Sequence, residues 1–360
     1  MLKLSGQIMS KDTVIATVQD GIITDSNQVL LPLFLKKTGD VEGWLGGRAI
    51  DSHRTNSRLL KKALRLTTAD DAELVLKVNG VTITDTYWFR GKGSALTYEE
   101  VRFKRNMFDK LALAGDPDSF NQPYSPTPEL TNIGSFEKCW RLDDGKWWMI
   151  KQCSELERFS ELFICRLGQA LKLSMADYHA ENGTIKSPEF TNGASVNYES
   201  AAGLAGGDED YDLNFDIFWK ISPEIAKQYL AIIYMDTICF NMDRHTQNYG
   251  VLRDVENGNI LSMAPNFDNN IALFARGIPN NLARQNDKLI SLFCELLEKD
   301  RRALEFAKQL SVPNREMINQ CIEQITIPVD HHVVSDFVMN GSDQVQDCIL
   351  KLSQQLGMGM

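Results

Sequence analysis

One segment near the middle of the chain predicts a long helix with almost no polar face. Ser222-Pro223-Glu224 is typical of a helix start, because a capping residue precedes a proline at the first helical position. Apolar residues then recur on most sides of the helix as far as Phe240. Only a central helix packed on most sides can bury such a surface, so the chain must fold around this segment. The polar run Asn241–Asn248 follows directly, and a loop held by a rigid element is the usual setting of catalytic residues.

The composition is that of a globular protein. Of the 360 residues, 43% are hydrophobic and 24% are charged, and a chain of this length is expected to form two or three units with their own cores. With 38 basic and 48 acidic residues the formal net charge is −10, which disfavours direct binding to nucleic acid or to an anionic membrane. No apolar run has the length of a signal peptide or a membrane span. The seven cysteines include no C-x-x-C pair, so we expect buried free thiols in a reducing cytoplasm.

Two adjoining segments before the central helix have well-defined boundaries. The β-rich run 138–151 is interrupted by Asp143-Asp144-Gly145, which predicts a hairpin with a short turn. Ser154 and Glu157 then form a capping box at the start of a helix. The proline-rich stretch 114–128, which precedes the hairpin, cannot hold regular structure, and we expect a linker there.

A basic segment lies nearer the N-terminus. Six cations occur between Arg48 and Arg65, with apolar residues at helical spacing among them. Charge on one face of a surface helix is common. We therefore expect these cations to lie on a solvated helix face rather than to form an anion-binding patch.

The polar run after the central helix has the residue types of a phosphotransfer site. The runs Tyr249–Leu252 and Ile260–Met263 predict a hairpin that would return Asp268 to the side of Asn248. Phosphoryl transfer needs a carboxylate that orients or deprotonates the attacking hydroxyl, and hard oxygen ligands for the magnesium on the nucleotide. By this order, Asp243 is the candidate base, and Asn248 and Asp268 are the candidate magnesium ligands.

Phosphoryl transfer also needs a cation on the nucleotide phosphates. Lys151 ends a strand directly before the capped helix, where a kinase small lobe places its strand lysine. The turn just before the hairpin is a candidate phosphate-covering loop. Its residues expected at the nucleotide are Gly134, Ser135 and Phe136.

Each of these residues taken alone has a simpler explanation. Asp and Asn are common in turns, and a strand lysine often lies along the surface with its amine in water. The hypothesis depends on their order along the chain: hairpin lysine, capped helix, central helix, Asp and Asn in one loop, then a hairpin and a second Asp. That order predicts an ATP- and magnesium-dependent kinase.

The same residues resemble the motifs of the HipA-type serine/threonine kinases. Asn241–Asn248 is similar to the family's catalytic loop T-D-[GR]-H-x-x-N, and Ala264–Asp268 is similar to its metal-binding segment [TA]-P-x-[YF]-D. Thr131–Lys138 looks like the family's phosphate loop S-x-x-G-x-Q-x-K, and Met149–Lys151 looks like the strand end with its ATP lysine.

The resemblance implies an α+β, two-lobed kinase-like fold related to the phosphoinositide kinases. It divides the chain into an accessory N-terminal domain (1–115), a small lobe with the phosphate loop (116–190) and a helical large lobe with the catalytic loop (191–360). It also implies a protein Ser or Thr hydroxyl as acceptor and an antitoxin-like partner. Autophosphorylation is implied at Thr131, with Ser135 as the competing site.

Several alternatives stay open at the level of the sequence. The acceptor could be the hydroxyl of a lipid or small molecule, or the chain could be a nucleotide-binding interaction module without turnover. The acid that pairs with Lys151 is also undecided between Glu157 and Glu161, which lie one turn apart on the same helix face.

Overall fold

The computed structural model describes residues 4–52, 54–66, 70–132, 134, 136–273, 275 and 281–358. The chain divides into two compact units, each assembled from separate segments. Unit 1 contains Met1–Cys153, His179–Glu199 and Val251–Leu261, and unit 2 contains Ser154–Tyr178, Ser200–Gly250 and Ser262–Met360. The division into an accessory domain and two lobes at residues 115 and 190 stays a prediction.

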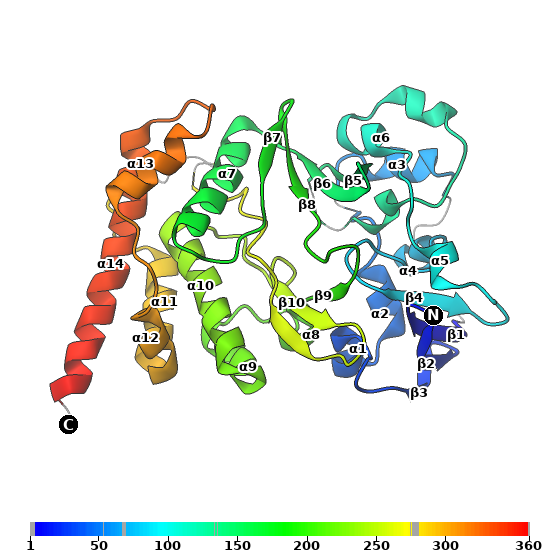
Figure 1. Cartoon of the computed structure of the whole chain (residues 1–360), viewed down its shortest axis with the longest axis horizontal. Helices are drawn as coiled ribbons and strands as arrows, with labels where there is room; N and C mark the ends of the chain where they lie inside the picture. The colour runs from blue at the N-terminus through cyan, green and yellow to red at the C-terminus, as the bar shows by residue number, and fades with distance from the viewer. Residues whose placement is uncertain are drawn as a thin grey trace. The chain divides into compact units, whose positions relative to one another are not determined.

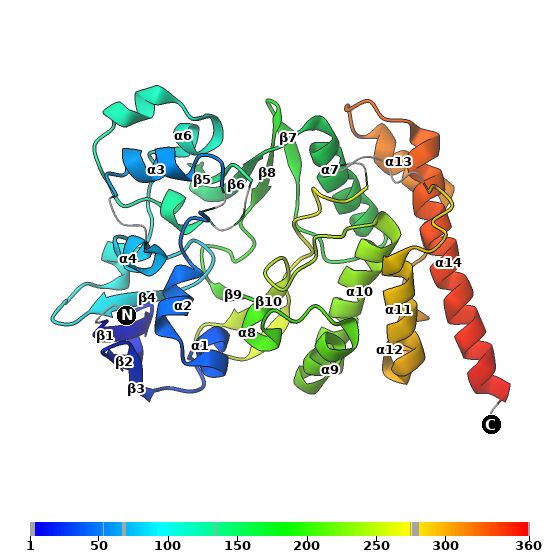
Figure 2. The same ribbon diagram turned by 180° about the vertical axis from the view of Figure 1, so that it is seen from behind.

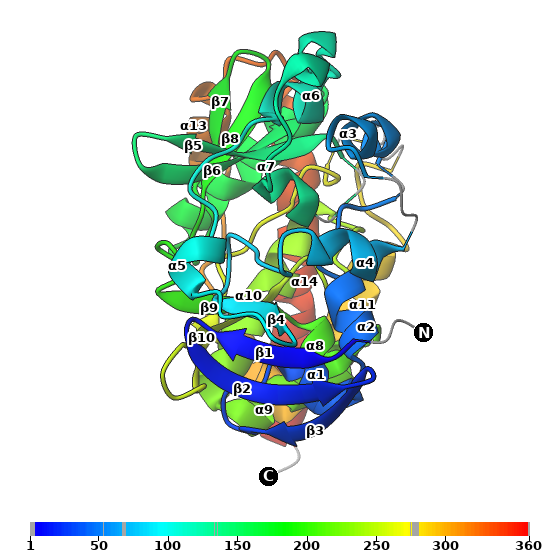
Figure 3. The ribbon, with the colours of Figure 1, turned by 90° about the vertical axis from the view of Figure 1, so that its right-hand side faces the viewer.

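Unit 1 contains two antiparallel sheets with short helices around them. The first sheet has the strand order β3-β2-β1-β4, of which β1, β2 and β3 are seen side by side in Figure 3, and the second has the order β5-β6-β8-β7. The elements of this unit are β1 (Gly6–Ser10), β2 (Thr13–Gln19), β3 (Ile22–Ser26), α1 (Leu33–Thr38), α2 (Val41–Gly46), α3 (Ser57–Ala63), α4 (Asp71–Leu76), β4 (Tyr87–Gly91), α5 (Tyr98–Val101), α6 (Asp109–Ala114), the 3-10 turns η1 (Pro117–Asn121) and η2 (Pro128–Thr131), β5 (Lys138–Asp143), β6 (Lys146–Gln152), β7 (His179–Glu181) and β8 (Thr184–Pro188).

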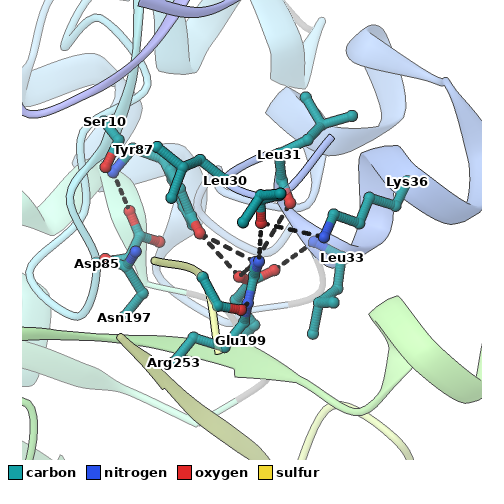
Figure 4. Close-up of polar contacts among 12 residues, drawn as sticks. Ser10, Leu30, Leu31, Leu33, Lys36, Asp85, Tyr87, Asn197, Glu199 and Arg253 are labelled. Carbon is teal, nitrogen blue, oxygen red and sulfur yellow. Dashed lines mark hydrogen bonds and ion pairs between the residues drawn. The ribbon is translucent and has the colours of Figure 1, made fainter. Parts of the chain in front are cut away.

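A buried polar network joins late and early segments of unit 1. A third sheet has the order β11-β10-β9, from strands β9 (Val196–Ser200), β10 (Gly250–Asp254) and β11 (Ile260–Met263). Glu199 of β9 forms an ion pair with Arg253 of β10, accepts a hydrogen bond from the Tyr87 hydroxyl (2.9 Å), and also accepts one from the backbone N–H of Leu33 (2.5 Å; Figure 4). Arg253 in turn donates to the carbonyl of Leu31 (3.2 Å). These bonds satisfy charges that would be costly to bury unpaired, and they fix segments distant in sequence to one another.

Unit 2 is helical and is built around α10 (Pro223–Cys239), as the sequence predicts. Most of α10 is buried, and it packs against α9, α11, α12 and α14 (Figure 1). Ser222 caps its first turn by accepting the N–H of Ile225 (3.2 Å). The other helices of this unit are α7 (Glu155–Ala170), α8 (Ala202–Ala205), α9 (Tyr211–Ile221), α11 (Lys288–Lys299), α12 (Arg301–Ala307), α13 (Arg315–Glu323) and α14 (His331–Met358), seen from behind in Figure 2.

The predicted hairpins and the capped helix are confirmed. Strands β5 and β6 pair antiparallel with the turn at Asp144-Gly145, and the Ser154/Glu157 capping box begins α7. Stretch 114–128 contains only the end of α6 and short 3-10 turns. Among the described residues, no helix is both long and apolar enough to cross a membrane.

The expectation for the basic segment is wrong at two of its cations. Arg58, Lys62 and Arg65 are exposed, but Arg48 and Arg54 are buried. The Arg48 guanidinium makes two hydrogen bonds of 2.8 Å to Asp85, and that of Arg54 donates to the carbonyl of Ala112 (2.5 Å). These partners are distant in sequence, so the local charge pattern contained no sign of them.

Candidate functional site

The loop after α10 holds its own polar side chains in place. Phe240 ends the helix in the left-handed conformation (φ 57°), and its N–H donates to the carbonyl of Asp236. The Asn248 side-chain amide donates to the carbonyl of Asp243 (3.0 Å), which closes the loop across five residues. Because the amide nitrogen of Asn248 is used within the loop, its Oδ1 is the atom with ligand chemistry. The Asp243 side chain is partly exposed.

A buried arginine, Arg244, connects this loop to the segment that contains Asp268. Its Nη1 donates to the carbonyl of Asn248 (2.7 Å) and to the carbonyl of Phe267 (2.6 Å). One guanidinium therefore binds the backbone at Asn248 and the backbone next to Asp268. The structure thus brings together the two segments that the sequence predicted to meet.

The charge of Arg244 is itself balanced inside the core. Its Nε and Nη2 form a bidentate pair with the Asp236 carboxylate, at 2.9 Å each. Its Nη2 also reaches Oδ1 of two asparagines that flank Asp268, Asn266 (2.9 Å) and Asn269 (2.7 Å). Burial alone would lower the pKa of Arg244, but the carboxylates of Asp236, Asp268 and Glu161 together outweigh burial and raise it. The guanidinium therefore stays charged. We call Arg244 and these partners the Arg244 network.

The backbone at Asp268 is held from α7 and from the chain that follows it. Asp268 has a left-handed backbone (φ 62°), an uncommon conformation for a residue with a side chain. Its N–H donates to the Tyr178 hydroxyl (3.3 Å). The next N–H, of Asn269, donates to both carboxylate oxygens of Glu161 (3.0 and 3.1 Å). These contacts hold the backbone from which the partly exposed Asp268 side chain extends.

Sequence reasoning missed the Arg244 network. Asp243, Asn248 and Asp268 were found by residue type, but Arg244 and Asp236 were given no role. One signal was present: Asp236 is a carboxylate near the end of a helix that is apolar on most sides. A buried carboxylate needs a partner, and the first arginine after the helix is Arg244.

In unit 1, two lysines and a glycine are close together at the predicted phosphate loop. Lys151 lies directly opposite Lys138 in the β5–β6 register, so both side chains are on one face of the sheet. Gly134 has φ 111°, and a Cβ at this position would lie 2.5 Å from Lys138 Nζ. The Gly134 backbone therefore lies close to the Lys138 ammonium group, and Lys151 is the cross-strand neighbour of Lys138. Phosphate binding requires such a combination of backbone and cations. Phe136 is half-buried, and Ser135 lies outside the described residues.

Thr131, the predicted phosphorylation site, is not presented to solvent. Its side chain is only 8% exposed, and its hydroxyl donates to the carbonyl of Pro128 (2.8 Å) in η2. Phosphorylation of Thr131 would require η2 to unwind. Nothing in the residues around Thr131 predicted this burial.

The two candidate glutamates of α7 have different surroundings. The carboxylate of Glu157 accepts the N–H of Ser154 (2.7 Å) in the capping box at the helix start. Glu161 is fully buried and holds Asn269, as described above. Glu161 is thus a supporting residue of the Asp268 segment.

Comparisons with known proteins identify the fold of this chain. No protein-family model matches the sequence, and no curated protein matches it. Among solved structures, the chain is similar to HipA of Shewanella oneidensis MR-1, solved in complex with HipB and its operator DNA. Identity is 15% and the TM-score is 0.55, over 96% of this chain and 97% of that chain. The chain is also similar to CtkA, a proinflammatory kinase of Helicobacter pylori, with 16% identity and a TM-score of 0.46 over 62% of this chain and 95% of that chain.

The likeness to HipA covers nearly the whole of both chains. The protein therefore has a HipA-like, kinase-type fold. The α+β kinase-like fold predicted from the sequence is confirmed, and the resemblance of the motifs to those of HipA-type kinases is confirmed at the level of the fold.

Proposed function

We propose that the protein is an ATP- and magnesium-dependent phosphotransferase that acts on a protein Ser or Thr hydroxyl. The observation that carries this proposal is Arg244, whose guanidinium binds the carbonyls of Asn248 and Phe267. It thereby connects a loop with a candidate base to a segment with a candidate metal ligand. The HipA-like fold, which extends over 96% of the chain, supports the same proposed function.

The proposed roles follow from the chemistry of each group. Asp243, at the partly exposed side of the loop, accepts or orients the proton of the attacking hydroxyl. Lys151 and Gly134 hold the phosphates, Lys138 adds a second positive charge, and Ser135 and Phe136 belong to the same loop. Two lysine ammonium groups and a glycine backbone at this place suit a triphosphate.

The donor set suits magnesium. Mg²⁺ prefers oxygen ligands and usually takes one or two carboxylates from the protein, together with the substrate's phosphates. Asn248 Oδ1 and the Asp268 carboxylate are such ligands, and the Arg244 network and Glu161 hold their backbone. When bound, the metal neutralises charge that develops on the phosphates.

We expect Asp268→Ala and Asn248→Ala each to weaken magnesium-dependent ATP binding by at least roughly tenfold, because each removes a hard oxygen ligand. Calorimetric titration of ATP with and without magnesium measures this. Asp343→Ala, on an exposed turn of α14, is the matched control and should bind as wild type does. Equal ATP affinity with and without magnesium in the wild-type protein would contradict both assignments.

The acceptor class is tested by where labelled phosphate goes. Wild-type protein is incubated with γ-labelled ATP and magnesium without an added substrate, followed by intact-mass and peptide mass spectrometry. We expect autophosphorylation on the 131–135 segment, at Ser135 or, after η2 unwinds, at Thr131. In a parallel incubation with added lipids or small molecules that carry hydroxyls, label found only on those molecules would replace the protein-kinase assignment with a lipid or small-molecule kinase. Bound ATP that is never consumed would indicate the interaction module.

An antitoxin-like protein partner is part of the same proposal. The HipA structure that this chain resembles contains HipB and operator DNA. This chain has a net charge of −10, so we assign any link to DNA to a partner rather than to direct contact. We also propose a cytoplasmic location, because no disulfide joins the cysteines in the part of the chain that the structure describes.

A further inference from the structure

The end of α10, where the chain enters the loop of Asp243, has backbone carbonyls that need donors from other segments. The last carbonyls of any helix have no partner within the helix itself. The N–H of Asn241, which would continue the helix by bonding to Thr237, donates to the carbonyl of Asp236 instead (2.9 Å). The carbonyl of Cys239 receives the N–H of Leu273 (3.1 Å). Because this end of α10 is buried, the carbonyls of Thr237 and Ile238 also require donors.

A buried arginine just before α11 supplies both donors. Nη1 of Arg284 donates to the carbonyl of Ile238 (2.7 Å), and its Nη2 donates to the carbonyl of Thr237 (2.6 Å). Its Nε donates to the carboxylate of Asp287 (2.7 Å), which caps the first turn of α11. One guanidinium therefore closes the end of α10 and binds the start of α11. A positive charge at the carboxyl end of a helix is also favoured by the helix dipole.

The guanidinium of Arg284 is enclosed where α10, α11 and α14 pack together (Figure 2). Its Cζ lies 5.5 Å from the ring centre of Phe240 and 4.5 Å from that of Phe337 in α14, within the range of cation–π contacts. Gly341 of α14 is so close that a Cβ there would overlap Nη1 of Arg284. The fully buried guanidinium therefore has little room to move.

These contacts act on the first residue of the catalytic loop. Phe240 follows α10 directly, has a left-handed backbone (φ 57°) and lies three positions before Asp243. Arg284 binds the two carbonyls of the last helical turn and also contacts the Phe240 ring. Arg244 holds the other end of the loop through the carbonyl of Asn248 (2.7 Å). Two buried arginines thus hold the two ends of the loop 240–248.

We propose that Arg284 is a positioning residue for phosphotransfer, which sets the direction in which the loop of Asp243 leaves α10. It acts through the backbone of α10 and through Phe240. The inference rests on the proposed function, in which Asp243 meets the acceptor hydroxyl. Because Arg244 holds Asn248 separately, loss of the Arg284 contacts should displace Asp243 more than Asn248. Small displacements of a reacting group slow a reaction strongly, so the rate should fall more than the affinity for ATP.

Arg284→Lys is the first test. A lysine keeps the positive charge beside Asp287, but its single amine cannot bind both carbonyls and Asp287 as a planar guanidinium does. We expect the phosphotransfer rate at saturating ATP to fall at least about tenfold, while ATP affinity stays within about threefold of wild type. The matched control is Arg315→Lys, in an exposed ion pair with Asp336, and it should behave as wild type does.

Gly341→Ala is the second test, because it keeps Arg284 and displaces its guanidinium. Alanine suits a helix, so α14 itself should remain. We expect the same loss of rate and the same ATP affinity as for Arg284→Lys. The matched control is Gly46→Ala in α2, where a Cβ would meet no atom within 4 Å.

Hydrogen exchange measures the position of the loop without any reaction. In both test variants the amides of residues 240–245 should exchange at least about fivefold faster than in wild type, and those of α7 should not change. Circular dichroism shows whether each variant is folded, and if Arg284→Lys does not fold, Gly341→Ala decides the question.

A wild-type rate in either folded variant would overturn the proposal, as would equal losses of rate and ATP affinity, or unchanged exchange at residues 240–245. A wild-type protein without phosphotransfer would overturn the proposed function instead. In that case the exchange measurement alone decides whether Arg284 holds the loop.

Discussion

Arg244→Met is expected to lower the free energy of unfolding by about 3–5 kcal/mol and to remove phosphotransfer at the same time. The substitution leaves the fully buried Asp236 carboxylate without its cation, and it removes the donor that binds the carbonyls of Asn248 and Phe267. For a unit of this size, that loss of unfolding free energy would lower the midpoint of thermal unfolding of unit 2 by roughly 10 °C. Chemical and thermal denaturation, with phosphotransfer assayed below the unfolding transition, measure both effects.

The double variant Asp236→Leu/Arg244→Met separates stability from function. Replacing both members of a buried ion pair with apolar side chains is often close to neutral, so much of the lost stability should return. Activity should stay low, because the two carbonyls still have no donor. Wild-type turnover in the double variant would show that the positions of Asn248 and Asp268 do not depend on Arg244.

Asp243→Asn is expected to reduce phosphotransfer by roughly 10²–10⁴-fold, the range of a lost general base, while ATP affinity stays within a few-fold. The carboxylate is proposed to contact the acceptor hydroxyl and not the nucleotide. The N–H of Asp243 bonds to Asn241 Oδ1 (3.2 Å), a backbone contact that the substitution keeps. Turnover and ATP titration are measured on the same preparation.

The isosteric control is Asp343→Asn on the exposed face of α14, which should behave as wild type does. A fall in ATP affinity equal to the fall in turnover would assign Asp243 to nucleotide binding. Unchanged turnover would show that the Asp243 carboxylate takes no part in the reaction.

The parts of the fold that depend on local sequence were predicted well. Ser222-Pro223 and the apolar residues after it define α10, and the Ser154/Glu157 box defines the start of α7, because a helix cap and a helix period are properties of neighbouring residues. The hairpin β5–β6 was found for the same reason. The order of the motifs also led to the HipA-like fold.

What could not be predicted depends on contacts between distant residues. Arg244 was read only as part of a motif, because its partners Asp236, Asn266 and Asn269 come from both sides of a hairpin. Arg48 looked like a surface cation because Asp85 follows it 37 positions later. A buried charge can be suspected from sequence, but its partner is known only when the chain is folded.

Phosphorus NMR of ATP during incubation with the protein and magnesium follows the proposed phosphotransfer itself. We expect the γ-phosphate signal of ATP to decline and ADP to appear with wild-type protein, and both to stay unchanged with Asp243→Asn although ATP is still bound. ATP that is bound by the wild-type protein but never converted to ADP would contradict the account, as would equal conversion by the Asp243→Asn variant.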